Sequence, residues 1–95
     1  MPTSADIAAA VERCRALVRR TPVLWTTPGD LGLSESVTLK LESLQHVGSF
    51  KACGSLNTAL GLGLPGGGLI AASGGNHGIA VARTARVLGV KAEIF

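Results

Sequence analysis

Two short segments of this 95-residue chain carry residue types that could do chemistry. The first is Gly48-Ser49-Phe50-Lys51, which places a lysine just past a glycine at the expected start of a helix. The second is Ser73-Gly74-Gly75-Asn76-His77-Gly78, a run of small residues and an amide at another expected strand-to-helix turn. A lysine amine can form a Schiff base, and the N–H groups of such a turn can bind an anion. The pair indicates a site for an aldehyde cofactor and a carboxylate substrate.

Taken together, residues 40–51 and 71–78 closely resemble the threonine/serine dehydratase family. These are fold-type-II pyridoxal phosphate enzymes, a group that also contains serine racemase and, more distantly, cysteine synthase and the tryptophan synthase β chain. The resemblance runs from about Thr21 to the last residue, and it covers only the front part of the family's length. It implies an α/β fold, a partial parallel sheet with helices on its faces, with pyridoxal 5'-phosphate as cofactor and a small amino acid as substrate.

The resemblance also implies roles for individual residues. Lys51 would be catalytic: it would bind the cofactor as a Schiff base and later act as the acid or base at the Cα proton. Phe50 would pack beside the pyridine ring, and Asn76 would hydrogen-bond the ring hydroxyl. The substrate carboxylate would be received by a loop of five residues, namely Ser73, Gly74, Gly75, Asn76 and His77. We expect His77 to contribute its backbone rather than its imidazole.

Purely structural roles remain open for several of these residues. Phe50 could serve only helix packing, and Ser49 and Asn76 could be N-caps of the two helices that follow, a position that both residue types favour. No histidine or cysteine spacing predicts a metal site. The glycine-rich run 65–68 precedes a strand and lacks the lysine of a phosphate loop, so we interpret it as a flexible turn.

The predicted reaction is elimination of the β-hydroxyl of L-threonine or L-serine, giving a 2-oxo acid and ammonia. Gly75 favours this lyase activity, because serine racemase has a serine at that position that serves the opposite face of Cα. The alternatives are a racemase, a β-replacement synthase or a non-catalytic truncated paralogue.

We interpret residues 1–95 as one incomplete N-terminal fragment of a catalytic domain, inactive alone, whose parent is a homo-oligomer. The family's phosphate loop and the partner of the pyridine nitrogen lie later in the chain. Family members commonly carry arginine where this chain has Cys53.

Composition excludes several other classes of protein. Hydrophobic residues make up 46% and charged residues 16% of the chain, which is typical of a buried α/β protein rather than a disordered one. The net charge of +3 comes largely from arginines around residues 13–20, but acidic residues interrupt that run and no aromatic residues interleave with it. We therefore expect no nucleic-acid binding. The longest apolar stretches are far shorter than the ~20 residues needed to span a bilayer, so we expect no membrane binding either. Two widely spaced cysteines and the absence of a signal sequence predict a cytoplasmic protein.

Hydrophobic periodicity and turn residues predict the elements that position the two segments. Helices are expected at 5–20, from 49 to 61 or 63, and at 76–88, the first capped by Thr3 or Ser4 and the last ended by Gly89. Strands are expected at 37–42, 69–72 and 90–95. Residues 22–35 should be extended, with a turn at 28–30. Alternating strands and helices predict right-handed crossovers and a parallel sheet.

Overall fold

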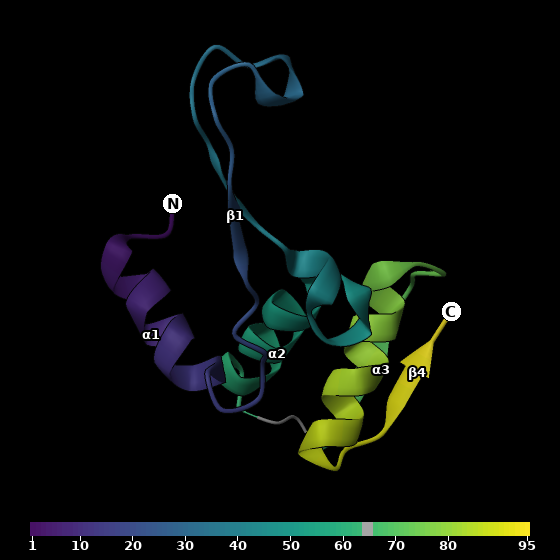
Figure 1. Cartoon of the computed structure of the whole chain (residues 1–95). Helices are drawn as coiled ribbons and strands as arrows, with labels where there is room; N and C mark the ends of the chain where they lie inside the picture. Colours follow the sequence, from purple (N-terminus) through teal and green to yellow (C-terminus); the bar gives the residue numbers. More distant parts are fainter. Residues whose placement is uncertain (64–65) are drawn as a thin grey trace.

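The computed structural model describes residues 1–63 and 66–95, and within them the chain forms helices, short 3-10 turns and two small sheets (Figure 1). The α-helices are α1 (Ser4–Cys14), α2 (Lys51–Gly61) and α3 (Asn76–Leu88). The strands are β1 (Val23–Trp25), β2 (Thr38–Lys40), β3 (Leu69–Ala71) and β4 (Ala92–Ile94). The 3-10 turns are η1 (Asp30–Gly32), η2 (Glu42–Leu44) and η3 (His46–Gly48).

Helix α1 begins with the cap that the sequence predicts. The Asp6 backbone N–H donates to Thr3 Oγ1 at 3.2 Å, and the Thr3 N–H donates to the Asp6 carboxylate at 2.7 Å. This reciprocal pair is a capping box, which satisfies two backbone donors at the helix start.

The predicted end of this helix at Arg20 is wrong, because α1 stops at Cys14. The chain turns there, and the Leu17 N–H donates to the Cys14 carbonyl at 2.9 Å. The side chain of Arg83, from α3, donates to the Leu17 carbonyl at 3.0 Å. This long-range bond ties the segment that follows α1 to α3, a tertiary contact that the local helical pattern of residues 15–20 does not reveal.

Strands β1 and β2 form an antiparallel hairpin, with Val23 opposite Lys40 and Trp25 opposite Thr38. The turn predicted at 28–30 is present, and Gly29 has a φ of 97° that favours glycine. The prediction that β2 belongs to the parallel sheet is wrong. Strand β2 pairs instead with β1, which lies within residues 22–35, where only an extended connection was expected.

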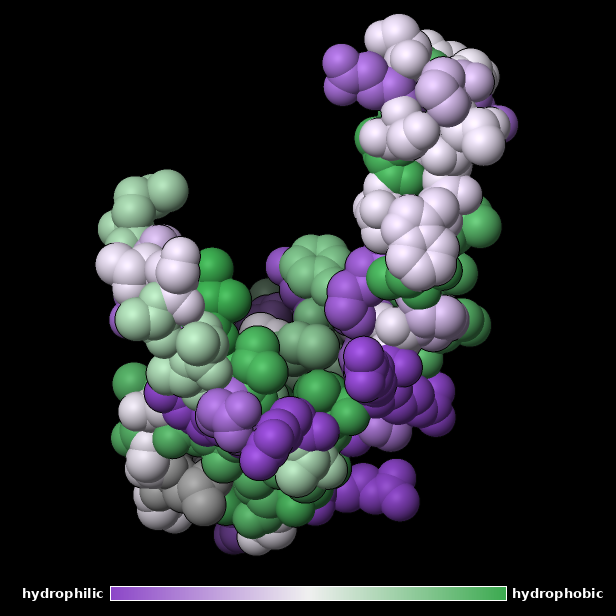
Figure 2. All heavy atoms as spheres, turned by 60° about the vertical axis from the view of Figure 1, so that its left-hand side comes forward, coloured by the Kyte–Doolittle hydropathy of each residue, from purple (hydrophilic) through white to green (hydrophobic). Residues whose placement is uncertain are grey.

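The hairpin stands clear of the body as an arm, which Figure 2 shows with open space between it and α1. It gives the chain its elongated shape of 50 × 31 × 24 Å. The Trp25 side chain is 73% exposed on this arm. An isolated two-stranded hairpin gains little stability by itself.

The parallel pairing that the sequence predicts is found between β3 and β4, with Leu69 opposite Ala92 and Ala71 opposite Ile94. Helix α3 connects the two strands and ends, as predicted, at Gly89 in the left-handed conformation with a φ of 70°. A turn precedes β3 at Gly66 and Gly67, as predicted, while Pro65 lies outside the described residues. None of the helices in the described residues is long and apolar enough to cross a membrane.

The core lies between α2 and α3. Helix α2 buries Ala52, Leu56 and Ala59, and α3 buries Ala80, Val81 and Ala85. Small residues let the two helices approach closely. Within this apolar contact a buried polar pair is satisfied, because the hydroxyls of Ser55 and Thr84 hydrogen-bond at 2.9 Å.

The core position of Leu56 leads to a first prediction. Its side chain is fully buried, so Leu56→Ala should lower the free energy of unfolding by about 2–5 kcal/mol. Leu62→Ala is the matched control: this leucine, at the end of the same helix, is 74% exposed and should cost less than about 0.5 kcal/mol. Urea unfolding followed by circular dichroism measures both values. Equal losses would contradict the assignment of the core to this helix pair.

Candidate active site

Lys51 is the first residue of α2, and its side chain is half-buried. Its Nζ lies 5.0 Å from the centroid of the Phe50 ring, which is within range for a cation–π contact. No hydrogen bond or ion pair holds the Lys51 amine within the described part of the chain. Lys40 differs, because its Nζ lies 2.6 Å from the Glu42 carboxylate. Of these two lysines, Lys51 is the one whose amine is available to a ligand.

A cavity of about 410 Å³ lies beside Lys51, between α2, β3 and α3. Its lining includes Phe50 and Lys51 from the start of α2 and His77 from the start of α3. The rest of the lining is largely small or apolar, with Leu69 and Ile70 contributed by β3. Its volume is in the range of small-molecule sites. The two titratable side chains of the lining, Lys51 and His77, lie where the two helices begin.

The loop before α3 is exposed and lies next to this cavity. Gly75 occupies the N-cap position without a side-chain hydrogen bond, and its own N–H donates to Ser73 Oγ at 3.3 Å. Asn76 is the first helical residue, so the alternative of Asn76 as N-cap is wrong. The first N–H groups of α3 therefore have no side-chain cap, and such groups attract anions. Of the predicted loop residues only His77 lines the cavity; Ser73, Gly74, Gly75 and Asn76 do not.

Gly78 allows this loop to fold back onto the helix that follows it. A Cβ at this position would lie 2.1 Å from the Ser73 carbonyl oxygen and 3.0 Å from Ile94 Cγ2. No side chain fits in that space. The position of the loop over α3 and β4 thus depends on the absence of a side chain at Gly78.

Helix α2 likewise begins without a side-chain cap. We predicted Ser49 as its N-cap, but the cap position is Phe50, and no side chain bonds the free N–H groups. Ser49 is only 7% exposed, and its Oγ has no hydrogen-bond partner among the described residues. A buried hydroxyl without a partner is costly. Ser49 lies two residues before Lys51 but does not line the cavity.

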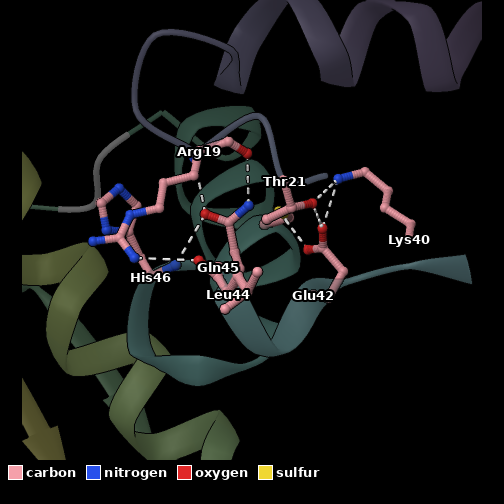
Figure 3. Close-up of polar contacts among 8 residues, drawn as sticks. Arg19, Thr21, Lys40, Glu42, Leu44, Gln45 and His46 are labelled. Atoms are coloured by element: carbon pink, nitrogen blue, oxygen red, sulfur yellow. Dashed lines mark hydrogen bonds and ion pairs between the residues drawn. The ribbon is translucent and has the colours of Figure 1, made fainter. Parts of the chain in front are cut away.

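Glu42 is the centre of a polar cluster behind the start of α2 (Figure 3). Its carboxylate accepts hydrogen bonds from Lys40 Nζ and Thr21 Oγ1, and these bonds lower the pKa of Glu42. Cys53 Sγ lies 3.8 Å from the same carboxylate. Burial, and then the charge of Glu42, raise the pKa of the Cys53 thiol. Cys53 is therefore a neutral, weak donor to Glu42, and Lys40 supplies the cation.

Sequence reasoning gave no role to Gln45, although its side chain connects two parts of the chain that lead into the site. It is 2% exposed and hydrogen-bonds the backbone of Arg19, 26 residues away. Its position inside the family-like segment was the only available signal, because a partner so distant in sequence leaves no local pattern. Among the described residues, no group of three or more histidine, cysteine or acidic side chains could hold a metal ion.

Comparison with known proteins identifies relatives of this arrangement. The profile of the family described as pyridoxal-phosphate dependent enzyme matches residues 15–95. Serine racemase of Schizosaccharomyces pombe is 35% identical over all of this chain and 30% of its own length. L-threonine dehydratase catabolic TdcB of Staphylococcus aureus is 41% identical over 94% of the chain and 27% of its own length.

A solved structure gives the same result at the level of the fold. The crystal structure of T.th. threonine deaminase superposes with a TM-score of 0.84 and 46% sequence identity. The match covers 99% of this chain and 33% of that protein. The chain thus spans about 30% of the length of the curated relatives it matches.

The close contact at Gly78 leads to a second prediction. Gly78→Ala should push the Ser73 carbonyl away from α3, displacing the loop and lowering stability by about 1–3 kcal/mol. Gly74→Ala is the control, since a Cβ there meets nothing within 4 Å. Amide hydrogen exchange of residues 73–79, together with thermal unfolding, measures the effect. Unchanged exchange in Gly78→Ala would show that the loop position does not depend on this contact.

Proposed function

This chain belongs to the family of pyridoxal-phosphate dependent enzymes of fold type II, and from that membership we propose that it is part of a threonine/serine dehydratase. The reaction proposed is elimination of the β-hydroxyl of L-threonine or L-serine to a 2-oxo acid and ammonia. The single observation that carries the proposal is the free amine of Lys51, facing the same cavity as the uncapped start of α3.

The residues at the cavity fit the family's cofactor. A volume of about 410 Å³ suits a small ligand, and the amine of Lys51 has no competing partner among the described residues. Phe50 offers an aromatic face 62% exposed beside that amine. Lys51 would hold the cofactor, and Phe50 would flank its ring.

Bound pyridoxal phosphate supplies an aldehyde that condenses with amines and a ring that accepts the electron pair left when Cα loses its proton. The protein has to supply the group that moves this proton. We assign the task to Lys51 Nζ, because the described cavity lining contains no carboxylate and its other titratable side chain, His77, is exposed at the start of α3.

The start of α3 has the complementary task of orienting the substrate. Its free N–H groups and positive helix end favour a carboxylate, and Gly74 and Gly75 leave room for close approach. Ser73, Asn76 and His77 complete the proposed substrate loop. The side chain of Asn76, which does not cap the helix, is assigned to the cofactor's ring hydroxyl by resemblance to the family. A substrate fixed by its carboxylate would present Cα to Lys51.

Gly75 favours a lyase over a racemase. Racemisation needs a proton-transfer group on each face of Cα, and Lys51 can serve only one. A glycine has no side chain for the other face. Serine racemase nevertheless remains the second candidate, because the fission yeast enzyme of that name matches the whole of this chain.

Three further points belong to the same proposal. The chain is the N-terminal part of a longer catalytic domain and is inactive alone; its share of the relatives' length supports the first point only so far as it makes the chain part of a longer protein. That longer protein is a homo-oligomer. Its location is the cytoplasm, in keeping with two cysteines that are both free thiols.

A third prediction concerns Lys51. Borohydride treatment of the full-length protein with pyridoxal phosphate should label the peptide that contains Lys51, and Lys51→Ala should lower 2-oxo acid formation by roughly a thousandfold. Lys91→Ala, on an exposed lysine, is the control and should keep its activity. Mass spectrometry of the labelled peptides and a turnover assay provide the two measurements. Label on Lys40 or Lys91 would refute the assignment.

A fourth prediction separates the two candidate reactions. The full-length protein should convert L-threonine or L-serine to 2-oxo acid with negligible D-amino acid. A Cβ at Gly75 meets nothing within 4 Å, so Gly75→Ser should fit and raise the ratio of racemisation to elimination by about tenfold or more. Gly75→Ala controls for the added bulk, since it has no hydroxyl. Chiral chromatography of the products measures the ratio of D-amino acid to 2-oxo acid. Substantial D-serine from the unmodified protein would make the lyase assignment wrong.

A further inference from the structure

We propose that Gln45 is a positioning residue that holds Lys51 in place by clamping a strained turn, residues 45–48, directly before α2. The inference rests on the proposed function in one respect, namely that Lys51 is the residue that carries the cofactor. Nothing in the motif itself assigns this task to Gln45. Its hydrogen bonds, and the backbone that follows it, carry the argument.

The side-chain amide of Gln45 makes three hydrogen bonds, all to backbone groups (Figure 3). Its Oε1 accepts from the N–H of Arg19 at 2.9 Å and from the N–H of His46 at 3.0 Å. Its Nε2 donates to the carbonyl of Arg19 at 2.8 Å. Because the side chain is only 2% exposed, water cannot easily replace these bonds. The start of the turn is thereby fixed to the segment that follows α1.

The turn that begins at Gln45 is strained. The Gly48 N–H donates to the Gln45 carbonyl at 2.9 Å, which closes the turn. Inside it, Val47 has φ 60° and ψ 13°, a left-handed conformation that is an outlier for a β-branched residue. Gly48 follows with φ 75°. A valine stays in this region only when its surroundings hold it there, and the Gln45 clamp is the contact that does so.

The turn determines where α2 begins. Gly48 lies three residues before Lys51, and Ser49, between them, is buried. Helix α2 has no side-chain cap that could fix its first residue independently. The 3-10 turn η3 also packs against α3. The turn is therefore in contact with the helix whose start forms the proposed substrate loop. Without the clamp, Val47 should relax to negative φ and move the start of α2, with Lys51 on it.

This mechanism predicts a specific rescue. In Gln45→Leu, the three hydrogen bonds are lost and Val47 is free to leave the left-handed region. Glycine adopts that region without strain. In the double variant Gln45→Leu/Val47→Gly, the turn should therefore keep its shape without the clamp. A merely structural Gln45 would give no such rescue, because Val47→Gly would then only add flexibility and its effect would be additive.

The experiment uses the full-length protein and pyridoxal phosphate, and it measures covalent labelling of the Lys51 peptide after borohydride as a function of cofactor concentration. We expect Gln45→Leu to raise the half-saturating concentration about tenfold, Val47→Gly alone to change it less than about twofold, and the double variant to recover at least half of the loss on a logarithmic scale. Thr26→Val is the matched control, since it removes buried hydrogen bonds to Val37 in the distant hairpin.

Each result has one meaning. Absence of label at Lys51 in the unmodified protein refutes the proposed function. Label at Lys51 that Gln45→Leu leaves unchanged, or a loss that Val47→Gly does not rescue, overturns the positioning role alone. If circular dichroism shows that Gln45→Leu is unfolded, Gln45→Met replaces it in the same comparison, because methionine has nearly the length of glutamine and also removes all three hydrogen bonds. The same rescue by Val47→Gly is then required.

Discussion

The packing of α2 against α3 is the interaction on which the rest of this structure depends. The two helices bury small and apolar side chains against each other, and the hydrogen bond between Ser55 and Thr84 fixes their register within the contact. Sliding one helix along the other would break this hydrogen bond and leave both hydroxyls unpaired in an apolar interface, which is costly. This register places the start of α2, with Lys51, at the same cavity as the start of α3. Both starts lack side-chain caps, so the free backbone donors of two helices converge on one region.

The polar cluster of Figure 3 lies behind this site and connects it to the N-terminal half of the chain. Glu42 connects three parts of the chain. Its carboxylate contacts Lys40 in β2, Thr21 in the segment between α1 and β1, and Cys53 in the first turn of α2. The resemblance to the dehydratases made Cys53 a departure from the usual arginine. In this structure Lys40 forms the ion pair with Glu42, and the neutral thiol of Cys53 lies beside the same carboxylate.

Local signals predicted those elements whose ends are fixed by nearby residues. The capping box at Thr3, the extent of α3 and its end at Gly89 depend on residues within a few positions of each other, so the sequence was sufficient. The predicted end of α1 was wrong because the segment after Cys14 is held by a tertiary contact that leaves no local pattern: Arg83, far along the chain, donates to the Leu17 carbonyl.

The candidate site was predictable in part, for the same physical reason. The two motif segments indicated Lys51 and His77, which line one cavity, while their roles toward a ligand stay a prediction. Ser49 and Asn76 have the side chains of N-caps but do not cap, and neither of them lines the cavity. The Gln45 clamp had no local signal, because its partner Arg19 is distant in sequence.

The central claim is that the turn at Gln45 and the packing of α2 on α3 present Lys51 to a cofactor bound between the two helix starts. A crystal structure of the full-length protein grown with pyridoxal phosphate tests it most directly. The account predicts continuous electron density from Lys51 Nζ to the cofactor, with the ring beside Phe50, the loop of Ser73 to His77 within contact distance, and Val47 still at positive φ. Density joined to another lysine, or a cofactor bound away from the start of α2, would contradict it.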